Sequence, residues 1–244
     1  MEKLSIQQVS KSFQEEQILE NISVELHKGE LVSLLGASGS GKTTLFNVIS
    51  GLTSPDTGKV LLDDVDITGT SGHMAYMLQK DLLMQHKTII DNVALPLILK
   101  GEKKQAAREK VAPYFADFGL EGTEHKYPSQ LSGGMRQRAA LLRTYMFSNE
   151  IALLDEPFSA LDSLTKSELH RWYLDVMDKI QLSTIFITHD IDEAILLSDR
   201  IYLLSGKPGT IKAEIVIAEP KPRSKDFLLS DAFLAYKKGI LSQL

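Results

Sequence analysis

The chain has 244 residues, 43% of them hydrophobic and 24% charged, which is ordinary for a folded protein that can bury a full core. Its net charge of −5 gives no support to a nucleic-acid partner, and the absence of cysteine excludes disulfides, cysteine zinc sites and thiol nucleophiles. The first residues lack an apolar signal core, and no apolar run approaches the roughly 18 residues needed to cross a bilayer. We therefore expect any work at a membrane to be done through a partner.

The first residues alternate between apolar and polar side chains, which is the pattern of half-exposed strands. Leu4, Ile6 and Val9 follow it, and residues 18–26 follow it again. We expect these two strands to form an antiparallel flap. Phe13 lies at the end of the first strand, where a nucleotide base could stack, although an aromatic residue taken alone is more often part of the core.

A glycine-rich stretch at residues 36–44, GASGSGKTT, joins two different apolar patterns. Residues 31–35 before it form an almost continuous apolar run, which is typical of a strand buried on both faces. Apolar residues recur at helical spacing in residues 45–52 after it. The order strand, loop, helix is the context of a phosphate-binding loop, and it disfavours the alternative of a chance glycine-rich turn.

The residue types of this loop each have a chemical reason. Gly36 and Gly41 let backbone amides approach a polyphosphate, and the following helix points the positive end of its dipole at the same anion. We expect Lys42 to reach the β and γ phosphates as a point charge. The Thr43 hydroxyl is expected to act as an oxygen ligand of Mg²⁺.

The middle of the chain changes to a helical pattern. A short strand pattern ends at Gln79, and residues 81–149 then show apolar residues at helical spacing. Pro113 must kink one of these segments or start a new helix. The sequence LSGGM at residues 131–135 runs from a Ser-Gly-Gly turn into a helix. We interpret the region as a helical subdomain inserted into an α/β core.

Two further buried strands end in polar side chains. Residues 151–154 form an apolar run that ends in Asp155 and Glu156, and a later run ends in His189. Polar groups at the carboxyl ends of parallel strands lie where open α/β sheets bind ligands. Asp155 is placed to hold Mg²⁺, directly or through water, and Glu156 to accept a proton from attacking water.

The end of the chain is expected to complete the sheet and add a helix. Residues 201–204 are predicted to form the strand that closes the sheet. An amphipathic terminal helix is predicted with Phe227, Leu234 and Leu241 on one face. We expect this helix to pack on the core without taking part in chemistry.

Taken together, these motifs resemble the nucleotide-binding subunit of an ABC transporter over nearly the whole chain. The motifs occur in the family's order: GASGSGKTT as the phosphate loop, Gln79 as the Q-loop, LSGGM as the signature, LLDEP as the second nucleotide motif, SALD at residues 159–162 as the D-loop, and THD as the switch histidine. The resemblance implies an α/β fold, a P-loop NTPase core with a mixed, mainly parallel sheet, an N-terminal antiparallel β flap and an inserted helical subdomain. It implies one ABC ATPase domain over residues 1–244, with 1–80 and 150–220 as the RecA-like core and flap, 81–149 as the helical subdomain and 221–244 as a helical tail.

The resemblance also implies how ATP and Mg²⁺ are held. Two copies would face each other head to tail, with ATP between the phosphate loop of one and the signature of the other. The implied nucleotide contacts are Phe13, Gly36, Ala37, Ser38, Gly39, Ser40, Gly41, Lys42, Thr43, Thr44, Ser132, Gly133 and Gly134. The implied catalytic residues are Glu156 as base together with His189, Gln79 and Lys42, and the implied Mg²⁺ ligands are Thr43, Gln79 and Asp155. Phe13 would stack on adenine, where the family more often has tyrosine.

Membrane partners are implied in the same way. Hydrolysis would drive two transmembrane permease subunits between inward-open and outward-open states, with a substrate-binding protein acting indirectly. A coupling helix of each permease would dock in a groove lined by residues 81–97, which places the chain at the cytoplasmic face of the cell membrane. The D-loop and switch regions and residues 204–211 look like those of importers of nitrate, of sulfonates such as taurine, and of pyrimidine precursors of thiamine.

Three alternatives stay open at this point. An exporter or lipid-release motor shares the motifs, although the stretch SGKPGTI favours import. An ABC ATPase of chromosome maintenance or DNA repair would carry a long coiled-coil insertion, and heptads are absent here, while the acidic balance disfavours DNA. A P-loop kinase would bind ATP without a second copy, so ATP-dependent dimerisation separates it from a transporter subunit.

Overall fold

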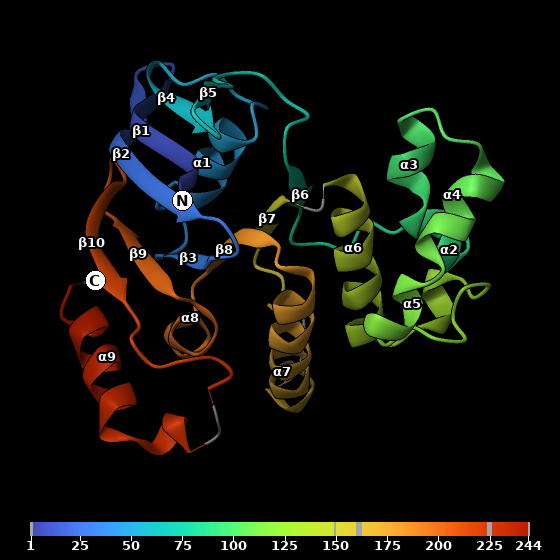
Figure 1. Cartoon of the computed structure of the whole chain (residues 1–244). Coiled ribbons are helices and arrows are strands. Elements are labelled where there is room, and N and C mark those ends of the chain that lie inside the picture. Colours follow the sequence, from blue (N-terminus) through green and yellow to red (C-terminus); the bar gives the residue numbers. More distant parts are fainter. Residues whose placement is uncertain (1, 149, 160–162, 224–225, 244) are drawn as a thin grey trace.

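The structure is a computed structural model of the chain, and it describes residues 2–148, 150–159, 163–223 and 226–243. In Figure 1 the strands of two β-sheets lie on the left and in the centre, and a group of helices extends to the right. Residues 160–162 of the predicted D-loop lie outside the described residues.

The larger sheet contains β3 (Leu31–Leu35), β6 (Ala75–Met77), β7 (Ile151–Asp155), β8 (Ser183–Thr188), β9 (Arg200–Ser205) and β10 (Thr210–Val216). The strand order is β10-β9-β3-β8-β7-β6, and all neighbours are parallel except β10, which is antiparallel to β9. Along β7, Ala152 and Leu154 belong to the core under the helices, whereas Ile151 and Leu153 belong to the core under the smaller sheet. Burial on both faces explains the unbroken apolar runs. The mixed, mainly parallel sheet is confirmed.

The edge of this sheet differs from the prediction. The strand at residues 201–204 was expected to close the sheet, which is wrong, because β10 pairs with its outer side. Side chains of β10 alternate between half-buried and exposed, as an edge strand with one solvated face requires. The segment therefore lacks the apolar run that identified the buried strands.

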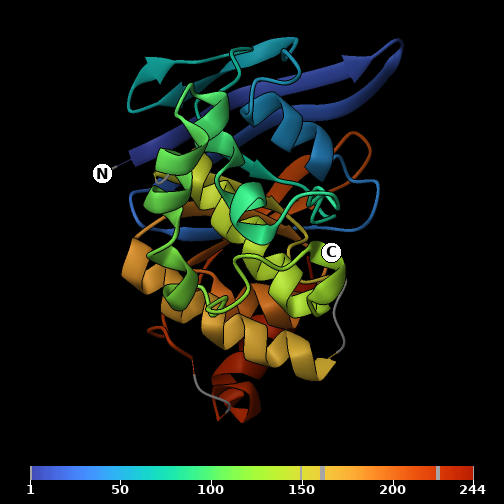
Figure 2. The same ribbon diagram turned by 90° about the vertical axis from the view of Figure 1, so that its right-hand side faces the viewer.

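The smaller sheet is antiparallel and contains β1 (Glu2–Phe13), β2 (Glu16–His27), β4 (Thr57–Leu62) and β5 (Val65–Asp66), in the order β2-β1-β4-β5. The predicted N-terminal flap is confirmed, and Figure 2 shows it above the rest of the molecule. Helix α1 (Lys42–Ile49) buries Leu45 and Phe46 in a core that both sheets share.

The helices of the middle region are α2 (Ile89–Val93), α3 (Leu95–Leu99), α4 (Lys104–Val111), α5 (Tyr114–Asp117) and α6 (Gly133–Phe147), with a 3₁₀ turn at Pro128–Gln130. Pro113 stands between α4 and α5, so it starts a new helix. Phe115 and Phe118 are buried against these helices. Figure 2 shows the group facing the viewer. The division of the chain into core, helical subdomain and tail stays a prediction.

The remaining helices are α7 (Ser163–Ile180), α8 (Ile191–Leu197) and α9 (Asp231–Leu241), with a 3₁₀ turn at Phe227–Leu229. The predicted apolar face of the terminal helix is wrong. Phe233 and Ile240 are buried, whereas Leu234 and Leu241 are exposed. Ser230 caps α9 after the 3₁₀ turn, so Phe227 is not in register with the helix. Within the described part of the chain, no helix is both long enough and apolar enough to cross a membrane.

Candidate nucleotide-binding site

The phosphate-loop residues connect β3 to α1, as the sequence predicts, and their glycines are needed for the backbone path. A side chain at Gly36 would place its Cβ 2.2 Å from the carbonyl oxygen of Leu204. Gly39 and Gly41 have φ values of +80° and +93°, which L-residues rarely adopt. The Ser40 hydroxyl is buried and has no hydrogen-bond partner among the described residues. The loop therefore carries a buried polar group that a ligand could satisfy.

Lys42 lies inside the curve of this loop. Its Nζ donates to the carbonyl oxygens of Gly36, at 2.8 Å, and Ala37, at 2.7 Å, and the side chain is largely buried. Burial lowers the pKa of Lys42, while the negative charges of Glu156 and Asp155 act in the opposite direction. The cation is thus held over the loop and close to two carboxylates.

Thr43 and Asp155 bring a hydroxyl and a carboxylate together beside the loop. The Thr43 hydroxyl donates a hydrogen bond to the Asp155 carboxylate at the end of β7. Burial, and after it the charge of Glu156, raises the pKa of Asp155, and Lys42 and Thr43 oppose this rise. Among the described residues no group of three or more histidines and carboxylates could hold a metal alone. The pair fits Mg²⁺, which is commonly held by one or two protein oxygens together with substrate phosphates and water.

Three neighbouring parallel strands bring Gln79, Glu156 and His189 together. Gln79 follows β6, Glu156 follows β7 and His189 follows β8, so all three lie at the carboxyl edge of the sheet. Gln79 Nε2 donates to Glu156 Oε2 at 3.1 Å, and His189 Nδ1 lies 3.0 Å from Glu156 Oε1. The Glu156 side chain is 19% exposed and that of His189 59%. Glu156 is therefore oriented from both sides and still reached by water.

The backbone at Glu156 is strained. Its φ is +45°, and its N–H donates to the carbonyl oxygen of Ile187 at 3.1 Å. Ser159 supports the turn, since its hydroxyl donates to the Glu156 carbonyl oxygen at 3.0 Å and accepts from Gln79 Nε2 at 3.3 Å. Sequence reasoning placed Ser159 in the D-loop and missed this contact. The position of Ser159 three residues after Glu156 was the available signal.

Phe13 is not a core residue. Its side chain is 49% exposed at the end of β1, and Lys11 Nζ lies 5.3 Å from the ring centroid. An exposed aromatic face at this position is free to stack on a base.

The signature residues stand apart from the phosphate loop of the same chain. Ser132 caps the N-terminus of α6, and its hydroxyl accepts from the Met135 amide at 3.3 Å. Gly133 and Gly134 form the first turn of α6. Figure 1 shows α6 among the helices on the right and α1 against the sheets on the left. The structure therefore assembles the phosphate loop with Gln79, Asp155, Glu156 and His189, and leaves the signature outside this group.

Comparison with known proteins agrees with the fold and the motifs. The family model described as ABC transporter matches residues 19–159. The formylaminopyrimidine import ATP-binding protein ThiZ of Halalkalibacterium halodurans is 45% identical over 78% of this chain and 74% of its own length. The aliphatic sulfonates import ATP-binding protein SsuB of Bacillus cereus is 39% identical over 98% and 95%, respectively. The nitrate import ATP-binding protein NrtD of Synechocystis is 38% identical over 93% and 87%.

Solved structures show the same similarity. The dimeric structure of MJ0796, a bacterial ABC transporter cassette, superposes with a TM-score of 0.74 at 28% identity, covering 89% of this chain and all of that one. A dimeric post-hydrolysis state of the same cassette, bound to ADP and phosphate, gives a TM-score of 0.73 at 29% identity, with the same coverage. The matched family model covers more than half of this chain. The chain therefore belongs to the ABC transporter family and is one of its ATPase subunits.

Proposed function

We propose that this chain is the ATP-hydrolysing motor of an importer and works as a head-to-tail dimer. The observation that carries the proposal is that the signature lies apart from the phosphate loop of the same chain. Gln79 and His189 each contact Glu156 beside the phosphate loop, whereas Ser132 caps an exposed helix N-terminus elsewhere. A second copy related by two-fold symmetry would bring its signature to the first copy's loop.

ATP would enter the half-site that this chain assembles by itself. The adenine would stack on Phe13, and the loop amides and the N-terminus of α1 would surround the phosphates. Lys42 Nζ now donates to two carbonyl oxygens, and phosphate oxygens would take their place. Thr43, Gln79 and Asp155 would hold Mg²⁺, whose positive charge would stabilise the phosphates.

Hydrolysis would be completed by the contacts around Glu156. The Glu156 carboxylate accepts a proton from water as the water oxygen attacks the γ-phosphorus, and the bond to the ADP oxygen breaks. His189 and Gln79, each about 3 Å from a different oxygen of Glu156, hold this carboxylate in place and would face the γ-phosphate. Ser132, Gly133 and Gly134 of the second copy would meet the γ-phosphate with a hydroxyl and two amides at a helix N-terminus.

The surface on either side of Gln79 in the chain is suited to a membrane partner. Leu78, Leu82 and Met84 are 44%, 56% and 37% exposed, which leaves apolar area uncovered beside the site. We assign residues 81–97 as the docking groove for a coupling helix of each of two permease subunits, which puts the chain at the cytoplasmic face. The sulfonate, nitrate and formylaminopyrimidine importers among its relatives make a small polar solute the expected cargo.

The test is the mass of the Glu156→Gln protein in solution with and without ATP and Mg²⁺. The substitution keeps the shape of the side chain and removes the base, so ATP should be bound and not hydrolysed. We expect the mass to rise from 27.1 kDa to about twice that value when ATP and Mg²⁺ are added, and to stay at the monomer value without ATP.

The matched control adds Ser132→Arg to the same protein. The double variant should bind ATP and remain monomeric, because a large cation blocks the signature without touching the phosphate loop. Unchanged turnover in Glu156→Gln would remove Glu156 from the role of base. Dimerisation of the double variant would show that the signature does not form the interface.

A further inference from the structure

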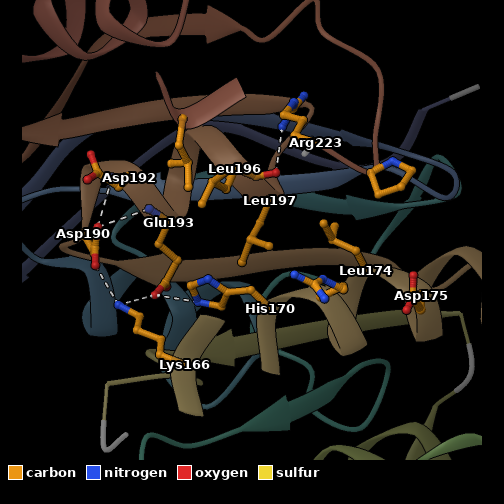
Figure 3. Close-up of a pocket in the computed structure, with 13 residues that line it drawn as sticks. Lys166, His170, Leu174, Asp175, Asp190, Asp192, Glu193, Leu196, Leu197 and Arg223 are labelled. Carbon is orange, nitrogen blue, oxygen red and sulfur yellow. Dashed lines mark hydrogen bonds and ion pairs between the residues drawn. The ribbon is translucent and has the colours of Figure 1, made fainter. Parts of the chain in front are cut away.

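A cavity of about 580 Å³ lies away from the nucleotide site, between α7, α8 and the segment that follows β10 (Figure 3). Its lining is apolar along Leu174 and Leu197 and polar at one end. In Figure 3 the side chain of Lys166, from α7, points at Asp190 and Glu193 at the start of α8. This polar end lies next in sequence to the switch histidine.

Lys166 joins two segments that the proposed hydrolysis site depends on. It lies near the start of α7, which begins directly after the segment predicted as the D-loop. Its Nζ is 2.6 Å from Asp190 Oδ2 and 2.8 Å from Glu193 Oε2. Because Asp190 directly follows His189, the side chain of Lys166 ties α7 to the turn that carries His189.

Asp190 connects Lys166 to the start of α8, because both of its carboxylate oxygens accept hydrogen bonds. Oδ2 accepts from Lys166, and Oδ1 accepts from the amides of Asp192 and Glu193 at 3.0 and 3.1 Å, which caps α8. The Asp190 amide donates to the hydroxyl of Thr188 at 3.0 Å. The turn from Thr188 to Asp190 is thus fixed on either side of His189.

Glu193 makes the charge of Lys166 necessary. Its side chain is 3% exposed, and a buried carboxylate is costly unless it is paired. Burial is the largest single influence and would lower the pKa of Lys166, but the hydrogen bonds and negative charges of Asp190 and Glu193 together outweigh it and raise the pKa. Both carboxylates therefore face a charged lysine at neutral pH.

The cluster of Lys166, Asp190, Glu193 and His170 also contacts the segment that follows Glu156, the residue paired with His189. His170 Nε2 lies 3.4 Å from Glu193 Oε2, and its ring packs edge-on against Phe158, with centroids 4.7 Å apart. Phe158 is buried two residues after Glu156. The cluster therefore touches the chain next to His189 and the chain next to Glu156.

We infer that Lys166 is a positioning residue for hydrolysis, which holds His189 at Glu156 by pairing with Asp190 and Glu193. The inference rests on the roles proposed for His189 and Glu156. Lys166 does not touch the nucleotide site, and its effect passes through the turn at Asp190. A displacement of a catalytic group by about 1 Å can cost up to about 100-fold in rate.

The experiment compares Lys166→Met, Lys166→Arg and Asp190→Asn in the full chain. Asparagine keeps the helix cap and removes the charge that pairs with Lys166. Lys166→Met and Asp190→Asn should each lower kcat for ATP about tenfold and leave KM unchanged, while Lys166→Arg should retain most of the turnover. The matched control is Arg171→Met, on the same helix and cavity, because Arg171 makes no hydrogen bond or ion pair with the described residues. It should leave kcat unchanged.

A second readout follows His189 itself. The ring signal of His189, assigned by its loss in His189→Gln, should move in Lys166→Met and Asp190→Asn, and stay in place in Arg171→Met. In a double-mutant cycle, Lys166→Met should cause no further loss of turnover in the His189→Gln background.

The outcomes separate this inference from the proposed function. Full turnover in His189→Gln would reject the role proposed for His189. A loss of turnover in His189→Gln without one in Lys166→Met and Asp190→Asn would reject the role of Lys166 and leave the proposed function intact. A loss in Lys166→Met with an unmoved His189 signal would assign Lys166 to general stability instead. If Lys166→Met does not fold, Asp190→Asn and Lys166→Arg still give both readouts.

Discussion

The phosphate-loop region and the signature region have opposite surroundings in this chain. Lys42 and Asp155 are buried, and Glu156 is held by contacts from two neighbouring strand ends. Ser132 is exposed, and its hydroxyl contacts only its own helix cap among the described residues. One region is organised before ligand arrives, while the other presents a helix N-terminus to the solvent.

This difference shows where the free energy of ATP binding can be used. In the proposed mechanism, the preformed phosphate loop would bind nucleotide in the monomer, and the exposed signature would gain a partner when a second copy closes on the same nucleotide. The strain at Glu156, with φ of +45°, belongs to the preformed side. The signature side carries no such strain at Ser132, whose φ of −64° is ordinary for a helix cap.

The comparison breaks if Lys42→Ala and Ser132→Arg have the same effect on ATP binding. We expect Lys42→Ala to weaken ATP binding to the monomer about 100-fold, because a buried charge-assisted contact to phosphate is lost. Ser132→Arg should leave that affinity unchanged and lower turnover about 100-fold, because the second half of the site cannot close. Calorimetric titration with ATP measures the affinity, and a steady-state phosphate assay measures the turnover.

The control for Lys42→Ala is Lys42→Arg, which keeps the positive charge in a larger side chain. It should retain part of the binding that Lys42→Ala loses. Equal ATP affinity in Lys42→Ala and the wild type would count against the whole nucleotide site.

Phe13→Ala sharpens the comparison on the preformed side. The exposed ring at the end of β1 is expected to stack on adenine, and loss of such stacking costs about 1–3 kcal/mol per base. ATP affinity should therefore fall about tenfold, with kcat at saturating ATP unchanged. Titration of the wild type and Phe13→Ala with ATP and with inorganic triphosphate measures this loss of affinity. Triphosphate lacks a base and should bind the two proteins equally.

Phe13→Tyr is the conservative variant for this position. It keeps the ring and should bind ATP like the wild type. An equal loss for ATP and triphosphate in Phe13→Ala would show that the flap, rather than base stacking, was disturbed.

The parts of the site that the sequence predicted share a physical cause. Strands buried on both faces leave continuous apolar runs, and the residue after each run lies at the carboxyl edge of the sheet. That rule placed Glu156 and His189 correctly at one edge, and the family resemblance added Gln79 and the signature. The glycine pattern predicted the phosphate loop because Gly36 and Gly41 are required by contacts and backbone angles that no other residue tolerates.

The parts that were missed depend on contacts between distant segments. β10 is an edge strand with alternating exposure, so its pattern is weaker than that of a buried strand. The buried face of α9 depends on where Ser230 caps the helix. The pairing of Lys166 with Asp190 joins residues 24 positions apart, and the sequence contains no periodic signal for it.

The smallest expected effect lies in the helical region, where Asp91→Asn should lower stability without changing the nucleotide site. Asp91 on α2 accepts from Arg108 on α4 at 2.8 and 2.9 Å, and Lys104 lies 3.1 Å away. The hydrogen bond from Arg108 is the main cause that holds the pKa of Asp91 at about 2, below its ordinary 3.8. We expect a loss of about 1–2 kcal/mol in the free energy of unfolding at pH 7, measured with urea.

The sign of the pH dependence makes this prediction specific. Because the pKa of Asp91 is lower in the folded protein, its contribution is present above about pH 4 and is lost as the pH falls toward about 2. Wild type and Asp91→Asn should therefore converge in stability at acid pH. The control is Asp117→Asn, which removes the exposed pair with Lys179 and should change stability by less than about 0.5 kcal/mol. A stability difference for Asp91→Asn that stays constant between pH 7 and pH 2 would show that the carboxylate charge is not its cause. Unchanged ATP affinity in the same variant would keep the helical region separate from the preformed half-site, because α2 and α4 then stabilise the fold without shaping the phosphate loop.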